Sequence, residues 1–379
     1  MTAEALWLAA PAAVIWFGTL LAPWFPWSTR ERIEADASAE PDPDLRQVTV
    51  LIPARNEAEV IGTTLAGLRA QGPGLQVVLV DDQSTDDTAR IALSFPGVRV
   101  ISGQPLPAGW AGKLWALEQG RAEVRTPLTL LLDADIELRP GLLAALLRRK
   151  REQRLNFVSL MADLRRTSFW DRLLLPAFVY YFKLLYPFAL SNSRFRYVAA
   201  AAGGCVLVDS AALRNVGAFA SLRGALIDDC TLARQVKGAS YRTWVGMSRG
   251  VVSLRPYGDL RSIHDMVARS AFTQLHYSSL LLLAVTLIFA CAYWLPLAGL
   301  FVPGARALSA LALLAMALGY WPTLRYYGLS PLWLLLKPLG ATLYIGMTWS
   351  SAIRYWRGVR SRWKDRVYAS NGGPASTEH

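Results

Sequence analysis

Cysteine and histidine are both scarce in this sequence of 379 residues, with three of each, far apart along the chain. So few cysteines exclude a small domain held together by disulfides. The scattered histidines exclude a metal site built from clustered histidine and cysteine ligands. The glycine patterns GxGxxG and GxxxxGK[ST] do not follow any expected strand, which excludes the two common glycine-rich phosphate loops.

Charged side chains are also few, at 18% of residues, whereas apolar residues make up 53%. Soluble domains have about 25% charged residues. The chain nevertheless has 40 Lys and Arg against 28 Asp and Glu, a net charge of +12, which fits nucleic acid or a membrane surface. A disordered acidic scaffold is excluded. The segments that lack charge favour the membrane, and we expect no nucleic-acid partner.

Three segments carry no charged residue: 5–29, 277–305 and 307–324. A helix needs about 20 apolar residues to cross a bilayer, so the first two are long enough and the third is borderline. The first segment is too long for a signal peptide and has no basic region before it. We therefore predict a transmembrane helix over 1–29. Arg30, Arg32 and Arg46 follow it, which places the linker 30–46 in the cytoplasm and the N-terminus outside.

The last hydrophobic region, 326–353, is interrupted by Lys337, Pro338 and Gly340. If it crossed the membrane, a tail with six basic residues would lie outside, against the positive-inside rule. We predict a re-entrant or interfacial hairpin, so that 272–353 forms two spans plus this hairpin. The basic tail 354–379 then returns to the cytoplasm and can contact anionic lipid headgroups.

Residues 47–271 have ordinary polarity and alternate between strand and helix patterns. We expect strands at 47–53, 76–80, 98–101 and 128–132, and helices at 60–70, 88–95, 113–121 and 140–151. This order predicts an α/β fold with a largely parallel sheet covered by helices on both faces. In such sheets ligands bind beyond the carboxyl ends of the strands.

Acidic residues follow the expected strands at that edge. Asp81 and Asp82 come after the second strand, and Asp133 and Asp135 after the fourth. Their carboxylates would repel one another unless a cation lay among them, which favours Mg²⁺ or Mn²⁺ with a diphosphate. The alternative for residues 81–86 is a turn with a helix cap. Lys113, at the start of a helix, either meets a phosphate or is solvated.

Several segments resemble one known family in order and spacing. They read VTVLIPARNEAEVIGTTLAGL, VVLVDDQSTDDTA, GKLWALEQG, LLLDADI, GGCVLVDSAALRNVGAF and DDCTLARQV. Together they resemble a glycosyltransferase of family 2 with the GT-A fold, over about residues 47–270. The stretch PAGWAGKLWALEQG and the membrane layout look most like the hopene-associated glycosyltransferases, and more distantly like ceramide glucosyltransferase.

The resemblance implies a nucleotide-sugar donor of the UDP type and a divalent metal, and it gives individual residues a role. Asp229 would be the base that takes the acceptor's proton, with Asp228 beside it; the alternative for this pair is a helix N-terminus. The resemblance further implies that the nucleotide is lined by Pro53, Ala54, Arg55 and Glu57, and that its nucleobase is bound by Asp81 and Asp82. Asp133 and Asp135 would bind the ribose and the metal, and Gly203 and Gly204 would face the acceptor.

The sequence departs from the family's (Q/R)xxRW motif. The equivalent segment, 266–270, keeps Arg269, which we expect at the diphosphate, but lacks the tryptophan. This difference argues against a growing polymer in the site and favours transfer of a single sugar. Trp363 and Arg366 resemble the W-x-G-R-x-Y end of related lipid glycosyltransferases, although Asp365 replaces the glycine. They place the cytoplasmic tail near the site.

Segment 167–190 is rich in aromatic residues but interrupted by charges and prolines. We predict a helix in the membrane interface, with a helix buried against the catalytic domain as the alternative. The interfacial position predicts a membrane-lipid acceptor, a hopanoid, for an enzyme of the bacterial inner membrane that crosses it several times. A polyisoprenyl-phosphate glycosyltransferase and a non-catalytic scaffold stay open. A sugar nucleotidyltransferase is excluded because PARNEA is not its glycine-rich loop.

Overall fold

The computed structural model describes residues 3–36, 44–223, 225, 228–363 and 366–369, with side chains from 7 to 358 within these ranges. The chain divides into two compact units. One unit is built around a β-sheet and comprises 31–165, 190–256 and 361–379. The other is helical and comprises 1–30, 166–189 and 257–360. Segments 166–189 and 257–271, which we had assigned to the catalytic domain, thus group with the apolar helices.

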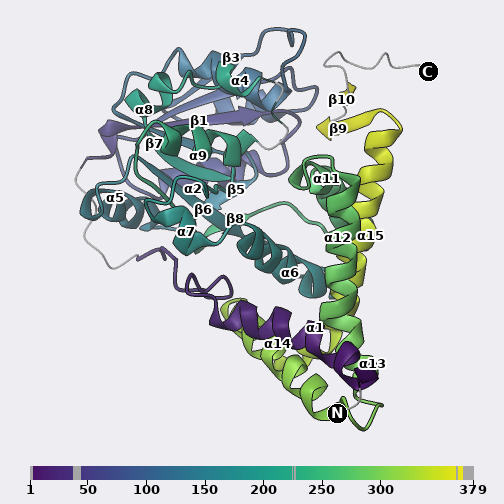
Figure 1. Ribbon diagram of the computed structural model, residues 1–379. Helices are drawn as coiled ribbons and strands as arrows, with labels where there is room; N and C mark the ends of the chain where they lie inside the picture. The colour runs from purple at the N-terminus through teal and green to yellow at the C-terminus, as the bar shows by residue number, and fades with distance from the viewer. Residues whose placement is uncertain (1–2, 37–43, 224, 226–227, 364–365, 370–379) are drawn as a thin grey trace. The chain divides into compact units, whose positions relative to one another are not determined.

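The first unit contains one eight-stranded sheet in the order β3-β2-β1-β4-β7-β6-β8-β5 (Figure 1). The strands β3, β2, β1 and β4 run parallel to one another. Helix bounds are α2 Ile61–Arg69, α3 Thr88–Leu93, α4 Gly112–Arg121, α5 Leu142–Glu152, α7 Phe188–Asn192, α8 Ser210–Asn215 and α9 Asp228–Gly238. Strand bounds are β1 Val48–Ala54, β2 Gln76–Asp81, β3 Val98–Ser102, β4 Leu128–Leu132, β5 Ile136–Leu138, β6 Phe157–Asp163, β7 Cys205–Asp209 and β8 Thr243–Ser253.

Helices cover both faces of this sheet, as the alternating strand and helix patterns predict. Strand β1 is buried along its whole length, and its side chains divide between two cores. Val50 and Ile52 pack with α2, α3 and α5 on one face. Leu51 packs with α4, α8 and α9 on the other. All four strands and four helices expected before residue 152 are present within a few residues of their predicted bounds.

The expectation of a largely parallel sheet holds only for that first half. Strand β7 runs antiparallel to both β4 and β6, and β5 runs antiparallel to β8, whereas β6 and β8 are parallel. The sheet is therefore mixed. The alternating pattern that predicts parallel strands stops after β4, because β5 follows β4 with only three residues between them and no helix to cross over.

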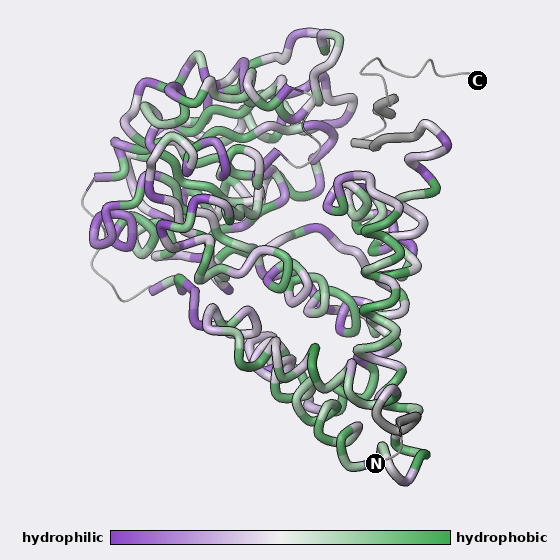
Figure 2. The backbone as a smooth tube through the Cα atoms, in the orientation of Figure 1, coloured by the Kyte–Doolittle hydropathy of each residue, from purple (hydrophilic) through white to green (hydrophobic). Residues whose placement is uncertain are grey.

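The second unit consists of helices with strongly apolar sequences, visible as green tube in Figure 2. Within it α1 packs along α14, and the indole of Trp16 donates a hydrogen bond of 2.8 Å to the carbonyl of Ala292. The helix bounds are α1 Ala3–Leu21, α6 Phe169–Leu185, α10 Leu260–Ala268, α11 Ala271–Gln274, α12 Ser279–Phe289, the π-helical turn Ala290–Trp294, α13 Leu295–Gly299, α14 Arg306–Tyr326, the 3₁₀ turn Pro331–Leu336 and α15 Lys337–Trp356.

Two helical stretches of the described residues, 279–299 and 306–326, are long and apolar enough to cross a membrane. The N-terminal helix is shorter than the predicted 1–29: α1 ends at Leu21, shortly before Pro23 and Pro26. The predicted interruption at Gly340 is wrong. Helix α15 is continuous for 20 residues, because Pro338 lies in its first turn, where proline needs no hydrogen-bond partner.

Helix α6 corresponds to most of the predicted interfacial segment 167–190. The charged residues Asp171 and Lys183 do not interrupt this helix, because both form hydrogen bonds with backbone groups. Asp171 accepts hydrogen bonds from the amides of Thr167 and Ser168 and closes a capping box, and the buried Lys183 donates to the carbonyl of Ser28. Helix α6 also packs against α14 and α15 within the helical unit. Its position in the membrane interface stays a prediction.

Strands β9 Val359–Trp363 and β10 Arg366–Ala369 form a separate two-stranded sheet. The predicted site residues Trp363 and Arg366 lie on these strands, and their side chains are outside the described part of the chain. The expectation that they approach the site therefore stays a prediction.

Candidate active site

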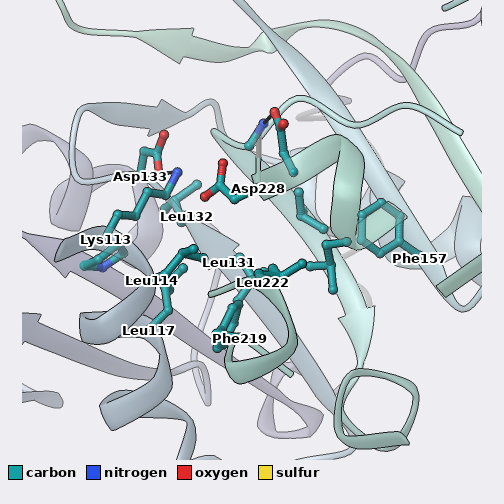
Figure 3. A pocket seen from close by; sticks show the side chains of 15 residues that line it. Lys113, Leu114, Leu117, Leu131, Leu132, Asp133, Phe157, Phe219, Leu222 and Asp228 are labelled. Carbon is teal, nitrogen blue, oxygen red and sulfur yellow. Dashed lines mark hydrogen bonds and ion pairs between the residues drawn. The ribbon is translucent and has the colours of Figure 1, made fainter. Parts of the chain in front are cut away.

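Six of the predicted site residues line one narrow pocket in the sheet unit (Figure 3). They are Pro53, Lys113, Asp133, Gly203, Asp228 and Asp229. They come from the carboxyl ends of β1 and β4, the first turn of α4, the residues before β7 and the first turn of α9. The rest of the lining is apolar: Leu114, Leu117, Leu131, Leu132, Phe157, Val206, Phe219, Leu222 and Leu232. The charged groups therefore share an otherwise apolar pocket.

The first turn of α4 carries Lys113 into this pocket because α4 packs very closely on the sheet. Its Gly120 faces β1 and β2, and a Cβ atom there would lie 2.3 Å from Leu51 Cδ1 and 2.7 Å from Val80 Cγ2. No side chain fits in that space. The glycine thus sets the distance between helix and sheet, and with it the height of Lys113 above the strand ends.

Lys113 is the central cation of the pocket. Its Nζ lies 2.6 Å from Asp133 Oδ1, and Figure 3 shows the ammonium beside Asp133 and facing Asp228. Burial alone would disfavour the charged form, but the carboxylates of Asp133, Asp228 and Asp229 outweigh it and raise the pKa of Lys113 above its ordinary value. Lys113 therefore stays charged. Of the two alternatives for Lys113, solvation is wrong in this structure, since its side chain is 23% exposed and ion-paired.

Asp229 is held by two backbone amides. Oδ2 accepts a hydrogen bond of 2.9 Å from Gly203, and Oδ1 accepts one of 2.7 Å from Cys230. Burial, followed by the charge of Asp228, raises the pKa of Asp229 to about 6. The carboxyl group is consequently fixed in orientation and still mostly ionised at pH 7. Gly203 permits this approach, because a Cβ there would lie 3.3 Å from Asp229 Cβ.

The second acidic residue after β4, Asp135, has a partner that the sequence did not reveal. Arg255, two residues beyond β8, places Nε 3.0 Å from Asp135 Oδ2. Burial and the charge of Asp133 raise the pKa of Asp135, and Arg255 and Lys113 act against that shift. No motif signals Arg255, because only the pairing of β5 with β8 brings these segments together.

The loops after β1 and β2 hold one another through side chains. Arg55 donates a hydrogen bond of 2.6 Å to the carbonyl of Asp82. Asp86 accepts from the amides of Ala58 and Thr88 and so stabilises the turn that leads into α3, whose N-cap is Asp87. Asp82 is fully buried, whereas Asp81 has one buried carboxylate oxygen, Oδ1, without a hydrogen-bond partner. An unsatisfied buried acceptor is typical of a site that binds a donor group.

The remaining predicted residues lie as follows. Ala54 ends β1, and the amide of Glu57 donates to Thr88 Oγ1, which ties the loop after β1 to α3. The carbonyl of Gly204 accepts from the amide of Asp133, so the acceptor-side loop and the donor-side carboxylate are joined. Arg269 is the C-cap of α10 in the helical unit, so the compact unit that holds Asp133 does not contain it.

The two carboxylates of Asp133 and Asp135 are the oxygen ligands that a hard divalent cation prefers. The charge of Asp133 raises the pKa of Asp135, so the two carboxylates are electrostatically close, as ligands of one ion must be. Among the residues that the structure describes, no group of three or more His, Cys, Asp or Glu side chains forms a metal cluster. A cation here would take its further ligands from a diphosphate and water, as Mg²⁺ commonly does.

The mixed sheet of this α/β unit thus has acidic side chains at the carboxyl ends of its parallel strands, with the ammonium group of Lys113 among them. Residues 49–217 match the family described as glycosyl transferase family 2. Residues 49–217 of this chain are thus similar to family 2 glycosyltransferases.

Two similar proteins extend this comparison. The 4,4'-diaponeurosporenoate glycosyltransferase of Staphylococcus aureus strain USA300 is 35% identical over 91 residues, which is 24% of this chain and 24% of that protein. The chain thus matches about a quarter of the length of this relative. A mannosyltransferase from Pyrobaculum calidifontis, solved in complex with GDP-Man and Mn²⁺, is 21% identical with a TM-score of 0.55, and the match covers 92% of this chain and 98% of that one. This likeness shows a shared fold.

Proposed function

We propose that this enzyme transfers a single sugar from a nucleotide-sugar donor, of the UDP type, to a membrane lipid. One observation carries the proposal: Asp133, Lys113 and Asp229 line one pocket. Asp133 and Asp135 serve the donor's diphosphate, and Asp229 serves the acceptor. Lys113 interacts electrostatically with both Asp133 and Asp229, so the donor side and the acceptor side of the site are close together.

On the donor side, Mg²⁺ or Mn²⁺ bound by Asp133 and Asp135 would neutralise the charge that develops on the leaving nucleotide. The mannosyltransferase from P. calidifontis holds GDP-Man together with Mn²⁺, which supports such a cation in this fold. Lys113 contributes a second positive charge at the helix N-terminus, where phosphates bind readily. Asp81, with its unsatisfied oxygen, offers an acceptor for the nucleotide.

On the acceptor side, Asp229 takes the proton from the attacking hydroxyl group, with inversion at the sugar carbon. A general base must be ionised at working pH and fixed in place. A pKa of about 6 and two backbone hydrogen bonds meet both conditions. Asp228 keeps the pKa of Asp229 high enough for it to accept a proton effectively.

The helical unit supports a membrane-bound enzyme with a lipid acceptor. Leucines of α12 and α14 that a soluble protein would bury are exposed: Leu280, Leu281, Leu283, Leu287, Leu311, Leu314 and Leu318. With α1 and the basic tail, these helices fit several crossings of the bacterial inner membrane, with the sheet unit in the cytoplasm. The acceptor we infer is a hopanoid, and a polyisoprenyl phosphate is the alternative. A scaffold without activity is disfavoured because the acidic site is complete.

One comparison favours a second acceptor class. The relative from S. aureus is named for 4,4'-diaponeurosporenoate, which by its name is a carboxylate. A carboxylate acceptor is already ionised at neutral pH and needs no base. The lipid acceptor of this chain would in that case be an apolar acid instead of an alcohol.

The test compares donor binding with turnover. Asp133→Ala should abolish metal-dependent UDP binding in calorimetry, whereas Asp229→Asn should bind UDP normally and lose transfer. Equal UDP affinity with and without the Asp133 change would overturn the donor-site assignment. Lipids from cells with and without this chain, compared by mass spectrometry, identify the acceptor. Purified enzyme that glycosylates soluble sugars but nothing in a lipid extract would refute the lipid acceptor.

A further inference from the structure

Both carboxylates that we assign to the metal are already paired with a basic side chain of the chain itself. Asp133 contacts Lys113 at 2.6 Å, and Asp135 contacts Arg255 at 3.0 Å. Lys113 belongs to a recognised motif, but Arg255 does not. Its side chain is 40% exposed, so a ligand that enters the site can reach it.

The position of Arg255 follows from the sheet. Strand β5 runs antiparallel to β8 with Ile136 opposite Ser253, and the amide of Leu254 donates a 2.7 Å hydrogen bond to the carbonyl of Asp135. The next residue, Arg255, lies just beyond the end of β8 and is thereby brought beside Asp135. The fold thus places the two side chains within reach of an ion pair.

A guanidinium group and a divalent cation compete for the oxygens of Asp135. When a nucleotide diphosphate enters with the cation, it brings negative oxygens that a guanidinium binds well. We propose that Arg255 is a donor-site residue with two partners: it occupies Asp135 in the empty site, and it binds the donor's diphosphate once a divalent cation takes Asp135. This inference rests on the proposed function and adds a residue to it.

A purely supporting role for Arg255 makes the opposite prediction for metal binding. Side chains that merely orient a metal ligand raise metal affinity, and their loss typically lowers it by about 10- to 100-fold. A competing cation lowers metal affinity, and its loss raises it. The sign of the change in Mn²⁺ affinity thus separates the two roles, without any measurement of activity.

The experiment uses the full-length enzyme in detergent and the variants Arg255→Gln, Arg255→Lys and Arg139→Gln. Arg139 is the matched control, because it pairs with Glu137 at 3.2 Å just beyond the same β5 strand. Mn²⁺ alone is titrated by electron paramagnetic resonance, and UDP is titrated by calorimetry at saturating Mn²⁺. A thermal unfolding curve of each variant shows whether it is folded.

For Arg255→Gln we expect Mn²⁺ affinity to rise roughly tenfold because the competing ion pair with Asp135 is lost, and UDP affinity to fall roughly tenfold because a charge-assisted contact to phosphate is lost. Arg255→Lys should keep Mn²⁺ affinity near wild type and recover part of the UDP affinity, and Arg139→Gln should change neither. Unchanged or weaker Mn²⁺ binding by a folded Arg255→Gln protein overturns the proposal, as does unchanged UDP affinity.

Failure of the broader function gives a different result. If the wild-type enzyme binds Mn²⁺ but no UDP, with or without metal, the nucleotide-sugar function is wrong and the diphosphate role of Arg255 falls with it. If the wild-type enzyme binds UDP and the Arg255 variants bind Mn²⁺ and UDP as tightly as wild type, the proposed function stands and the inference about Arg255 is refuted.

Discussion

The dependence of sugar transfer on pH follows directly from the environment of Asp229. A base with a pKa of about 6 is about 91% ionised at pH 7 and about 9% ionised at pH 5. The active form is the ionised one, so kcat/KM should fall about tenfold between pH 7 and pH 5, with its midpoint near pH 6. Above pH 7 the same group should cause no further increase.

Asp228 supplies a variant that moves this midpoint in a known direction. Its charge is the second cause of the raised pKa of Asp229, after burial. Asp228→Asn should therefore shift the acidic limb of the pH profile to lower pH. The limb should not disappear, because burial still raises the pKa of Asp229. The measurement is initial transfer rate against pH at saturating metal, with lipid acceptor in detergent micelles.

Donor binding must be measured over the same range, because burial and the charge of Asp133 also raise the pKa of Asp135. Calorimetry with UDP at saturating Mn²⁺ gives that control. The reasoning is refuted if kcat/KM stays constant from pH 7 to pH 5, or if the residual activity of Asp229→Asn keeps the same acidic limb as wild type. If UDP affinity falls with pH in the same way as kcat/KM, the acidic limb arises from the donor site and not from Asp229.

Two further predictions concern the metal and the packing of α4. Removal of divalent cations with EDTA should abolish UDP binding, and added Mn²⁺ should restore it; calorimetry that finds UDP binding unaffected by EDTA would contradict a metal at Asp133 and Asp135. Gly120→Val should lower the free energy of unfolding of the sheet unit by about 1–3 kcal/mol or more, since its side chain would overlap Leu51. Gly238→Ala is the control, because a Cβ there meets nothing within 4 Å, and unfolding curves in urea compare the two.

The first half of the sheet could be predicted because its signals are local. Strands β1, β2 and β4 are largely apolar runs bounded by polar turns, and β1 and β2 are each followed by a helix. A parallel crossover follows from such an order. The residues at the carboxyl ends could be predicted for the same reason, and the pocket brings together residues from β1, α4, β4 and α9.

The second half of the sheet depends on pairing between segments that are far apart in the sequence. Ile136 pairs with Ser253, more than a hundred residues away, and no local pattern specifies that register. Arg255 was missed because its role exists only through this pairing. Arg269 was selected by a motif match; it is the C-cap of α10 in the helical unit, and its contact with the diphosphate stays a prediction.

The acceptor class and the role of Asp229 can be decided by one variant assayed with two acceptors. An alcohol has to lose its proton as it attacks, so Asp229→Asn should cost about 10²- to 10⁴-fold in rate with a lipid alcohol. A carboxylic acid is ionised well below pH 7, so the same variant should transfer sugar to an apolar acid at nearly the wild-type rate. The Asp229→Asn variant can keep only one of the two backbone hydrogen bonds of Asp229, because the NH2 group of its side chain cannot accept from an amide. This loss is the same with either acceptor, so a difference between the two reactions reports on proton removal. If Asp229→Asn loses both reactions equally, Asp229 does more than remove a proton, and its contact with Gly203 on the acceptor-side loop becomes the group to vary next.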